Sequence, residues 1–282
     1  MILKSLKNSF STALLEHYPE TEIDSFFNLL SEHVLKMKRI DISQNLYSLV
    51  SGKKYDKFDN AIIRLKDYEP IQYIIGDTEF YSLTFNVTPS VLIPRSETEE
   101  LVDWIINEQK DKDQISILDI GTGSGCIAIS LAKNLPNAKV YALDVSEEAL
   151  KVAEQNALLN EVEVEFIEAN ILDWNFSNLE FDVIVSNPPY VRELEKEAMS
   201  ANVLNHEPHL ALFVEDEDAL LFYRKITESA KRGLKSKGDL YFEINEVLGK
   251  DMSQLLSDSG YSNIELKKDI FQKDRMIKAN KL

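Results

Sequence analysis

Four consecutive residues, Asn187, Pro188, Pro189 and Tyr190, carry the most specific chemistry in this sequence. The apolar run at 183–185 predicts a strand buried on both faces, which ends at the prolines because they lack N–H groups. The side-chain oxygen of Asn187 and the carbonyl of Pro188 are two acceptors beside an aromatic ring. Such a set suits a planar –NH2 group, either a carboxamide or the exocyclic amine of a base. The alternative is a plain proline-rich turn, but the complete tetrad favours a catalytic, substrate-binding site.

A glycine-rich loop follows the strand predicted at 115–120. Its residues expected to contact a cofactor are Asp119, Gly121, Thr122, Gly123, Ser124 and Gly125. Glycines allow a tight turn and a close approach of ligand to backbone, and the next helix offers free N–H groups. A dinucleotide site would have its third glycine one residue later, where this chain has Cys126. Gly-x-Gly-x-Gly after an acidic residue is instead associated with S-adenosylmethionine, the predicted cofactor.

Asp144 is the second part of the predicted cofactor site. It ends the strand predicted at 140–143, where a carboxylate can accept both hydroxyls of a ribose. Its alternative role is to cap the following helix, but Ser146 is already placed to do so. We therefore predict that Asp144 binds the ribose.

The adenine ring is expected near the end of the third strand, at Asn170 and Ile171, where a polar residue meets an apolar one. Residues 172–174 are the competing position. Asn187 is expected to border the cofactor as well as the substrate, since the methyl group must meet its acceptor there.

The elements that position these residues alternate from residue 115 onward. Strands are predicted at 115–120, 140–143, 162–167, 181–186, 239–244, 261–266 and 276–279, and helices at 126–133, 147–159, 218–234 and 248–256. Strands separated by helices predict an α/β fold with a doubly wound, mainly parallel sheet. Ligands of such sheets bind at the carboxyl ends of the strands, where the tetrad and the glycine loop fall.

The first part of the chain has a different pattern. Residues 1–68 show helical spacing throughout and predict a small helical bundle, whereas the apolar residues at 73–93 recur with a period of two and predict a β-hairpin. We therefore predict a helical substrate-docking domain at 1–72, a hairpin connector at 73–93 and a catalytic domain at 94–282.

Charged residues surround the start of the helix predicted after Pro94. Ser96 is the expected N-cap, with Glu99 at its N3 position. Arg95 and Glu97 either act on the helix end electrostatically or bind the substrate, and we predict substrate binding.

Four further polar residues are candidates for the site. His206 and His209, with Glu207 between them, lack a matching set of ligands elsewhere, so we predict loop residues near the substrate and no metal. Glu243 ends a predicted strand and is either structural or a support for the site.

Charge, cysteine content and the length of apolar runs restrict the classes of protein to which this chain can belong. The 282 residues carry a formal charge of −17, which argues against a non-specific nucleic acid binder. The single Cys126 cannot form an internal disulfide, and no apolar run reaches membrane-spanning length. These features predict a cytoplasmic protein that needs no membrane, and they leave its oligomeric state open.

Several motifs together resemble the HemK/PrmC methyltransferases over essentially the whole chain. They are Pro-Ile-Gln-Tyr-Ile-Ile-Gly at 70–76, Leu-Ile-Pro-Arg-Ser-Glu-Thr-Glu at 92–99, Ile-Leu-Asp-Ile-Gly-Thr-Gly-Ser-Gly at 117–125, Val-Ser-Asn-Pro-Pro-Tyr-Val at 185–191 and Glu-Pro at 207–208. The family commonly has proline where this chain has Ser96 and glycine where it has Ala219.

The resemblance implies both a fold and a reaction. The implied fold is a Rossmann-like S-adenosylmethionine-dependent methyltransferase sheet with an N-terminal helical bundle and a β-hairpin. The implied reaction methylates the side-chain amide nitrogen of the glutamine in the Gly-Gly-Gln motif of peptide chain release factors, which are the expected partners.

Two rival functions remain. Asn-Pro-Pro-Tyr also occurs in adenine-N6 methyltransferases acting on nucleic acids, but these are expected to carry a basic recognition surface. A non-catalytic scaffold that binds S-adenosylmethionine would have no use for an intact tetrad.

Overall fold

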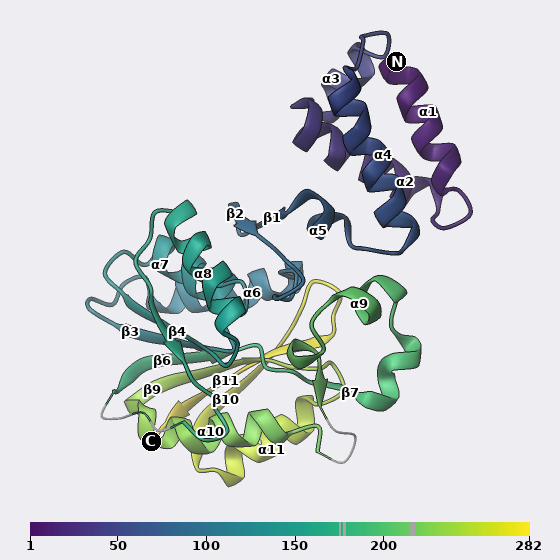
Figure 1. Ribbon diagram of the computed structural model, residues 1–282. Coiled ribbons are helices and arrows are strands. Elements are labelled where there is room, and N and C mark those ends of the chain that lie inside the picture. Colours follow the sequence, from purple (N-terminus) through teal and green to yellow (C-terminus); the bar gives the residue numbers. More distant parts are fainter. Residues whose placement is uncertain (175, 177–178, 215–217) are drawn as a thin grey trace. The chain divides into compact units, whose positions relative to one another are not determined.

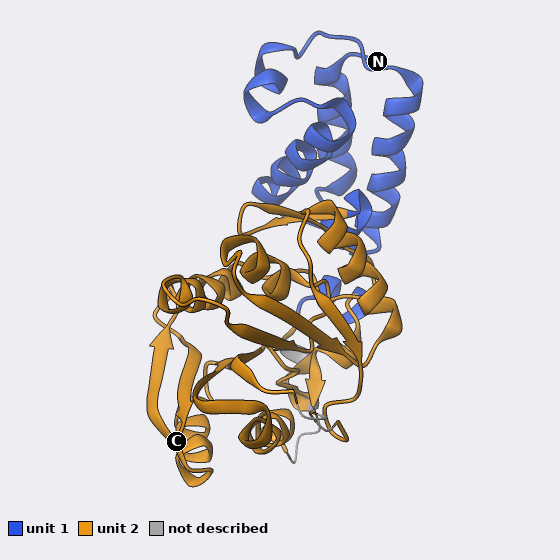
Figure 2. Cartoon of the chain, turned by 90° about the vertical axis from the view of Figure 1, so that its left-hand side faces the viewer, with its two compact units in different colours: residues 1–76, 200–206 blue, residues 77–199, 207–282 orange. Residues whose placement is uncertain are grey.

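The computed structural model describes residues 1–174, 176, 179–214 and 218–282. The chain forms two compact units: Met1–Gly76 with Ser200–His206, and Asp77–Met199 with Glu207–Leu282 (Figure 2). No helix within these described ranges is both long enough and apolar enough to cross a membrane.

The smaller unit is helical. Its elements are α1 (Leu3–Leu14), α2 (Glu20–Leu30), the π-helical turn η1 (Ser31–Leu35), α3 (Arg39–Gln44), α4 (Gly52–Lys66), α5 (Ile71–Ile75) and α9 (Ala201–His206). Phe10, Phe27 and Phe58 form the centre of its core, with ring centroids 5.5–6.2 Å apart. The apolar stripes that predicted helices in this region thus pack against one another.

Helix α5 shows where the helical unit ends. The period-two pattern predicted a hairpin from Tyr73, but residues 71–75 are helical and the first strand begins at Asp77. Pro70 precedes the helix, and the guanidinium of Arg64 donates to the carbonyls of Tyr73 and Ile74 at the other end. These backbone contacts stabilise a short helix that periodicity did not reveal.

The larger unit is built on a seven-stranded sheet of order β10-β11-β9-β6-β3-β4-β5. The strands are β3 (Ser116–Ile120), β4 (Lys139–Asp144), β5 (Glu165–Glu168), β6 (Phe181–Ser186), β9 (Leu234–Glu243), β10 (Tyr261–Lys268) and β11 (Asp274–Lys281). Strands β5, β4, β3, β6 and β9 are parallel, and β11 is antiparallel to both of its neighbours. The predicted α/β class with a mainly parallel sheet is confirmed.

Helices cover both faces of this sheet (Figure 1). Those on one face are α6 (Ser96–Gln109), α7 (Cys126–Asn134) and α8 (Glu147–Leu159), and those on the other are α10 (Leu221–Gly233) and α11 (Gly249–Asp258). Val183 and Val185 of β6 face the first core, whereas Ile184 faces the second. The strand before Asn187 is therefore buried on both sides, as its apolar run predicted.

A β-hairpin formed by β1 (Asp77–Phe80) and β2 (Leu83–Asn86) packs on α8. The side-chain amide of Asn156 exchanges hydrogen bonds of 2.7 and 3.0 Å with the backbone of Asn86 and donates to the carbonyl of Ser124. Asn160 donates to the carbonyl of Thr84. The hairpin is thus tied to the larger unit and, through Asn156, to the glycine loop.

Short elements follow the tetrad. They are β7 (Val191–Arg192), which pairs in parallel with β8 (Phe213–Val214), and the 3₁₀ helices η2 (Glu193–Ala198) and η3 (His209–Ala211). The sequence showed no periodicity for these short pieces.

Candidate active site

The glycine loop turns sharply at the carboxyl end of β3. Gly121, Gly123 and Gly125 have φ of +74°, +55° and +81°, a left-handed backbone that residues with a Cβ rarely adopt. The N–H groups of Gly121 and Thr122 both donate to the carbonyl of Leu143, at 2.8 and 3.0 Å. These two hydrogen bonds hold the loop against the end of the neighbouring strand β4.

Asp144 lies against this loop. Its Oδ2 accepts a hydrogen bond of 2.8 Å from the N–H of Gly123, and its Oδ1 accepts one of 2.9 Å from Ser146. Ser146 itself caps α8 through a 3.2 Å bond from the N–H of Ala149, as predicted. Each carboxylate oxygen has a second lone pair, so Asp144 keeps acceptor capacity for a ligand.

Asp119 lies behind the loop and is fully buried. Its Oδ2 accepts a hydrogen bond of 2.6 Å from the hydroxyl of Thr122. Burial raises the pKa of Asp119 to about 7. Asp119 and Thr122 therefore shape the loop from within.

One pocket of about 350 Å³ brings most predicted site residues together. From the prediction it is lined by Gly121, Gly123, Asp144, Asn170, Ile171, Asn187, Pro188 and Pro189. Its volume lies within the range of small-molecule sites, roughly 300–1,000 Å³. A Cβ added at Gly121 or Gly123 would meet no atom within 4 Å, so these glycines border open space. An acceptor carboxylate, a bare backbone and apolar walls fit an adenosyl cofactor.

Other predicted cofactor residues do not line this pocket. The pocket lining does not include Asp119, Thr122, Ser124 or Gly125. A Cβ on Gly125 would come within 2.8 Å of Cδ1 of Ile129, so this glycine permits close packing between the loop and α7.

Sequence reasoning missed several lining residues. They are, among others, Leu92, Leu143, Pro208, Leu210, Ala211, Phe222 and Ile226. Leu92 and Pro208 lie within the quoted motifs, which is a signal that could have found them. Phe222 and Ile226 have the ordinary spacing of a helix core, so nothing in the sequence distinguishes them.

The tetrad extends from the pocket into the interior. Nδ2 of Asn187 donates to Oγ1 of Thr98 over 3.5 Å, while Pro188 is buried beside it. The hydroxyl of Tyr190 donates to Oε1 of Glu243 over 3.3 Å, and Tyr190 packs against the core rather than lining the pocket. Burial raises the pKa of Tyr190.

Arg95 and Glu97 do not line the pocket either. Nη2 of Arg95 donates to Oε1 of the buried Glu207 over 2.7 Å, and the other oxygen of Glu207 accepts from the N–H of Ile93. Arg95 therefore joins the segment before α6 to the segment at Glu207–Pro208. Glu97 accepts a hydrogen bond from the hydroxyl of Ser96.

The predicted N-cap at Ser96 is wrong. Ser96 is the first residue of α6 and Arg95 occupies the cap position, without a side-chain capping bond. Glu99 accepts from the N–H of Tyr81 instead of completing a capping box. Proline is also favoured at the first helical position, which explains why the family can have it where this chain has Ser96.

The two histidines belong to different compact units. His206 belongs to α9 of the helical unit, where its Nε2 is 2.7 Å from the carbonyl of Asp67, so it is not a loop residue. His209 belongs to the larger unit, where it is the first residue of the 3₁₀ helix η3 and so is not a loop residue either, and its ring packs edge-on against Phe213. Across the residues that the structure describes, no group of three or more potential ligands is arranged to hold a metal ion.

Known families match both parts of the chain. The methyltransferase small domain matches residues 98–213, and the PrmC N-terminal domain matches residues 6–76. The chain is 53% identical to the release factor glutamine methyltransferase of Flavobacterium psychrophilum, with 99% of each chain covered. It is 47% identical to that of Bacteroides thetaiotaomicron, over 95% of this chain and 96% of the relative.

Solved structures match the fold. A methyltransferase from Pyrococcus furiosus has a TM-score of 0.52 at 20% identity, covering 79% of this chain and 98% of that one. A Thermus thermophilus 16S rRNA N2 G1207 methyltransferase in complex with AdoMet and guanosine has a TM-score of 0.56 at 15% identity, covering 73% of this chain and 50% of that one. At such identities the likeness concerns the fold.

Proposed function

The chain belongs to the release factor glutamine methyltransferase family, and from this premise we propose which residues carry the reaction. The proposed reaction transfers a methyl group to the side-chain amide nitrogen of the glutamine in the Gly-Gly-Gln motif of peptide chain release factors. The observation that carries it is that one pocket is lined both by the glycine loop with Asp144 and by Asn187, Pro188 and Pro189.

S-adenosylmethionine is the methyl donor, and its sulfonium group supplies an electrophilic methyl. Asp144 would accept hydrogen bonds from the ribose hydroxyls with the lone pairs that Gly123 and Ser146 leave free. Asn170 and Ile171 would border the adenine, and the bare backbone at Gly121 and Gly123 would allow close approach. These roles need no movement of the loop, because Asp144 already fixes it.

Asn187 and Pro188 would act on the substrate amide. An amide nitrogen is a poor nucleophile because its lone pair is delocalised into the carbonyl. Accepting its two N–H bonds at Oδ1 of Asn187 and at the carbonyl of Pro188 would orient the nitrogen toward the donor. The same acceptors stabilise the positive charge that develops as the nitrogen is alkylated. The N–H protons become more acidic as this charge grows, and one of them leaves to solvent to give the neutral N-methyl amide.

The remaining tetrad residues would support this arrangement. Pro189 lines the pocket and stiffens the turn because its φ is fixed. Tyr190 contacts Glu243 instead of the pocket, so we assign it a positioning role. Arg95, paired with Glu207, would hold the segment at Glu207–Pro208 in place, and Glu97 in the first turn of α6 is proposed to bind the substrate.

The helical unit is proposed to dock the body of the release factor, which extends selectivity beyond one side chain. The matched N-terminal domain at 6–76 supports this assignment. A protein substrate of the translation machinery and a single free cysteine both fit a cytoplasmic enzyme without direct nucleic acid binding.

The test is mass spectrometry of a release factor after incubation with this protein and S-adenosylmethionine. We expect one methyl group on the Gly-Gly-Gln glutamine, and none when that residue is replaced by glutamate. Asn187→Ala should lower kcat by about 10²–10³ because one acceptor at the developing charge is lost. Methylation of duplex DNA in place of the release factor would instead favour the adenine-N6 reaction.

A further inference from the structure

Asn187 is one end of a chain of hydrogen bonds that runs into the protein interior. Its amide nitrogen donates to Thr98, and the hydroxyl of Thr98 donates to Oε2 of Glu243 over 2.5 Å. Tyr190 donates to the other oxygen of the same carboxylate. Thr98 and Glu243 are each 2% exposed, so water does not substitute for these partners. These hydrogen bonds join α6, the segment after β6 and the end of β9.

The number of hydrogens available for these hydrogen bonds fixes the orientation of the Asn187 side-chain amide. A threonine hydroxyl has one hydrogen and an ionised Glu243 has none, so the hydrogen in the 2.5 Å contact between their oxygens is that of Thr98. Oγ1 of Thr98 can then only accept from Asn187. The –NH2 end of the Asn187 amide must therefore face Thr98, and Oδ1 must face away from it.

An asparagine without such a partner has no fixed orientation, because its oxygen and nitrogen ends have nearly the same shape. Turned one way, Asn187 offers the pocket an acceptor that suits an –NH2 group. Turned the other way, it offers a donor that suits a carboxylate or a carbonyl oxygen. The partner of Asn187 thus decides which substrate group the site receives.

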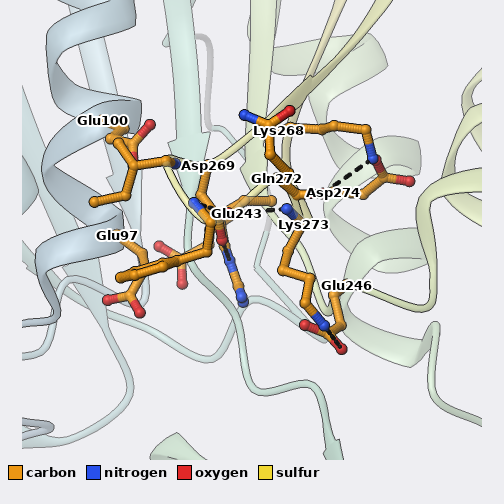
Figure 3. Close-up of polar contacts among 12 residues, drawn as sticks. Glu97, Glu100, Glu243, Glu246, Lys268, Asp269, Gln272, Lys273 and Asp274 are labelled. Carbon is orange, nitrogen blue, oxygen red and sulfur yellow. Dashed lines mark hydrogen bonds and ion pairs between the residues drawn. The ribbon is translucent and has the colours of Figure 1, made fainter.

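Burial and the neighbouring polar groups act on the pKa of Glu243 in opposite directions. Burial raises the pKa of Glu243, and the hydrogen bonds from Thr98 and Tyr190 and the charge of Arg275 oppose this rise. Arg275 is itself paired with the buried Asp269 at 3.1 Å. Figure 3 shows Asp269 among the polar side chains near Glu243. Glu97 on α6 adds a weaker repulsion that raises the pKa of Glu243.

We propose that Thr98 and Glu243 are positioning residues that hold Oδ1 of Asn187 toward the substrate and thereby select a carboxamide over a carboxylate. This inference rests on the proposed function and adds the origin of its specificity. It assigns a role to two residues that touch neither substrate nor cofactor, since neither lines the pocket.

The experiment compares three variants on two forms of a release factor. Thr98→Val removes the hydroxyl at nearly constant shape, Thr98→Ser retains it, and Glu243→Met removes both carboxylate acceptors at similar side-chain length. Thr227→Val is the matched control, because the buried hydroxyl of Thr227 has no hydrogen-bond partner in the described chain. The substrate carries the acceptor glutamine, and the competitor carries glutamate in its place.

We expect Thr98→Val and Glu243→Met to lower kcat by about tenfold or more, the equivalent of one lost hydrogen bond near 1.4 kcal/mol. Affinity for S-adenosylmethionine, measured by calorimetry, should stay within about twofold, which a general loss of structure would not allow. The glutamate competitor should bind these two variants about tenfold more tightly, relative to the glutamine form, than it binds the unmodified enzyme. Thr98→Ser and Thr227→Val should keep the original preference.

Unchanged preference for glutamine in Thr98→Val and Glu243→Met would overturn the inference. If Thr98→Val fails to fold, Glu243→Met decides by the same competition measurement. Should both fail to fold, Thr98→Ala decides by the same measurement, and an unchanged preference for glutamine overturns the inference. An unmodified enzyme that does not methylate the release factor at all would instead refute the proposed function.

Discussion

The N–H of Gly123 donates a hydrogen bond of 2.8 Å to Oδ2 of Asp144. This bond joins the loop after β3 to the end of β4, although the two residues are 21 positions apart. The same carboxylate is proposed to bind the ribose, so it has both a structural and a ligand-binding task. Replacing Asp144 should therefore weaken cofactor binding by more than the loss of one ligand contact alone would.

Asp144→Ala is expected to weaken binding of S-adenosylmethionine by at least about 1.5–3 kcal/mol, the usual value of one charge-assisted hydrogen bond. Loss of the Gly123 contact adds to this by loosening the loop. Calorimetry on the folded variant measures the change. Glu147→Ala, which removes an exposed carboxylate three residues further on, is the control and should bind normally. Unchanged affinity in Asp144→Ala would refute the ribose assignment.

The glycines of the loop should respond differently to alanine. Gly125→Ala combines a left-handed backbone with a Cβ only 2.8 Å from Ile129, so we expect a loss of about 2–4 kcal/mol in the free energy of unfolding. Gly123→Ala adds only backbone strain, about 1–2 kcal/mol, because its Cβ meets nothing within 4 Å. Its Cβ would instead occupy ligand space. Urea denaturation should rank Gly125→Ala as the less stable variant, and the opposite order would contradict this packing.

Asp119 should make stability depend on pH. Its pKa is about 7 in the folded chain because of burial, whereas an unfolded aspartate has a pKa of about 3.9. Between these values the folded state keeps a proton that the unfolded state releases. Asp119 therefore lowers the free energy of unfolding as pH rises from about 4 to 7, by up to about 1.4 kcal/mol per pH unit. Above pH 7 both states are ionised and this slope vanishes.

Asp119→Asn removes the titrating group and should flatten the slope in this window. Urea denaturation of the cofactor-free protein at several pH values measures it. Asp173→Asn removes an exposed carboxylate and serves as the control. Equal slopes for Asp119→Asn and the unmodified protein would show that Asp119 is ionised throughout.

The sequence predicted the sheet well because each strand and helix repeats one pattern over several residues. The strand at 181–186 and the helix at 147–159 have the predicted bounds, since β-branched runs and regular helical spacing leave little choice. Helix α5 was missed because a five-residue helix is too short for periodicity, and its ends depend on Arg64 from another helix.

The candidate site was predictable where chemistry follows directly from residue type. Glycines with positive φ, Asp144 and Asn187 belong to this class. The partners of these residues were not predictable, because Thr98 and Glu243 are separated by 145 positions and meet only in the folded sheet. Glu207 was likewise placed beside Arg95 by tertiary structure alone.

Exposed apolar residues of the helical unit allow its proposed docking role to be tested. If this unit holds the body of a release factor, its surface should matter for the intact protein and not for a short Gly-Gly-Gln peptide. Tyr47 and Leu49 are 74% and 83% exposed, and large apolar side chains left in water are candidates for such contacts. Tyr47→Ser with Leu49→Ser should raise KM for the intact release factor by about tenfold or more, as expected for two lost contact residues.

The kcat and the rate on the peptide should not change, because neither residue belongs to the unit that contains the pocket. Leu158→Ser is the matched control: Leu158 is 79% exposed on α8 of the larger unit, and its loss should leave KM for the release factor unchanged. A rise in KM for both substrates would indicate damage to the catalytic unit instead of lost docking. Equal KM values for the double variant and the unmodified enzyme on the intact release factor would remove this face of the helical unit from the docking site.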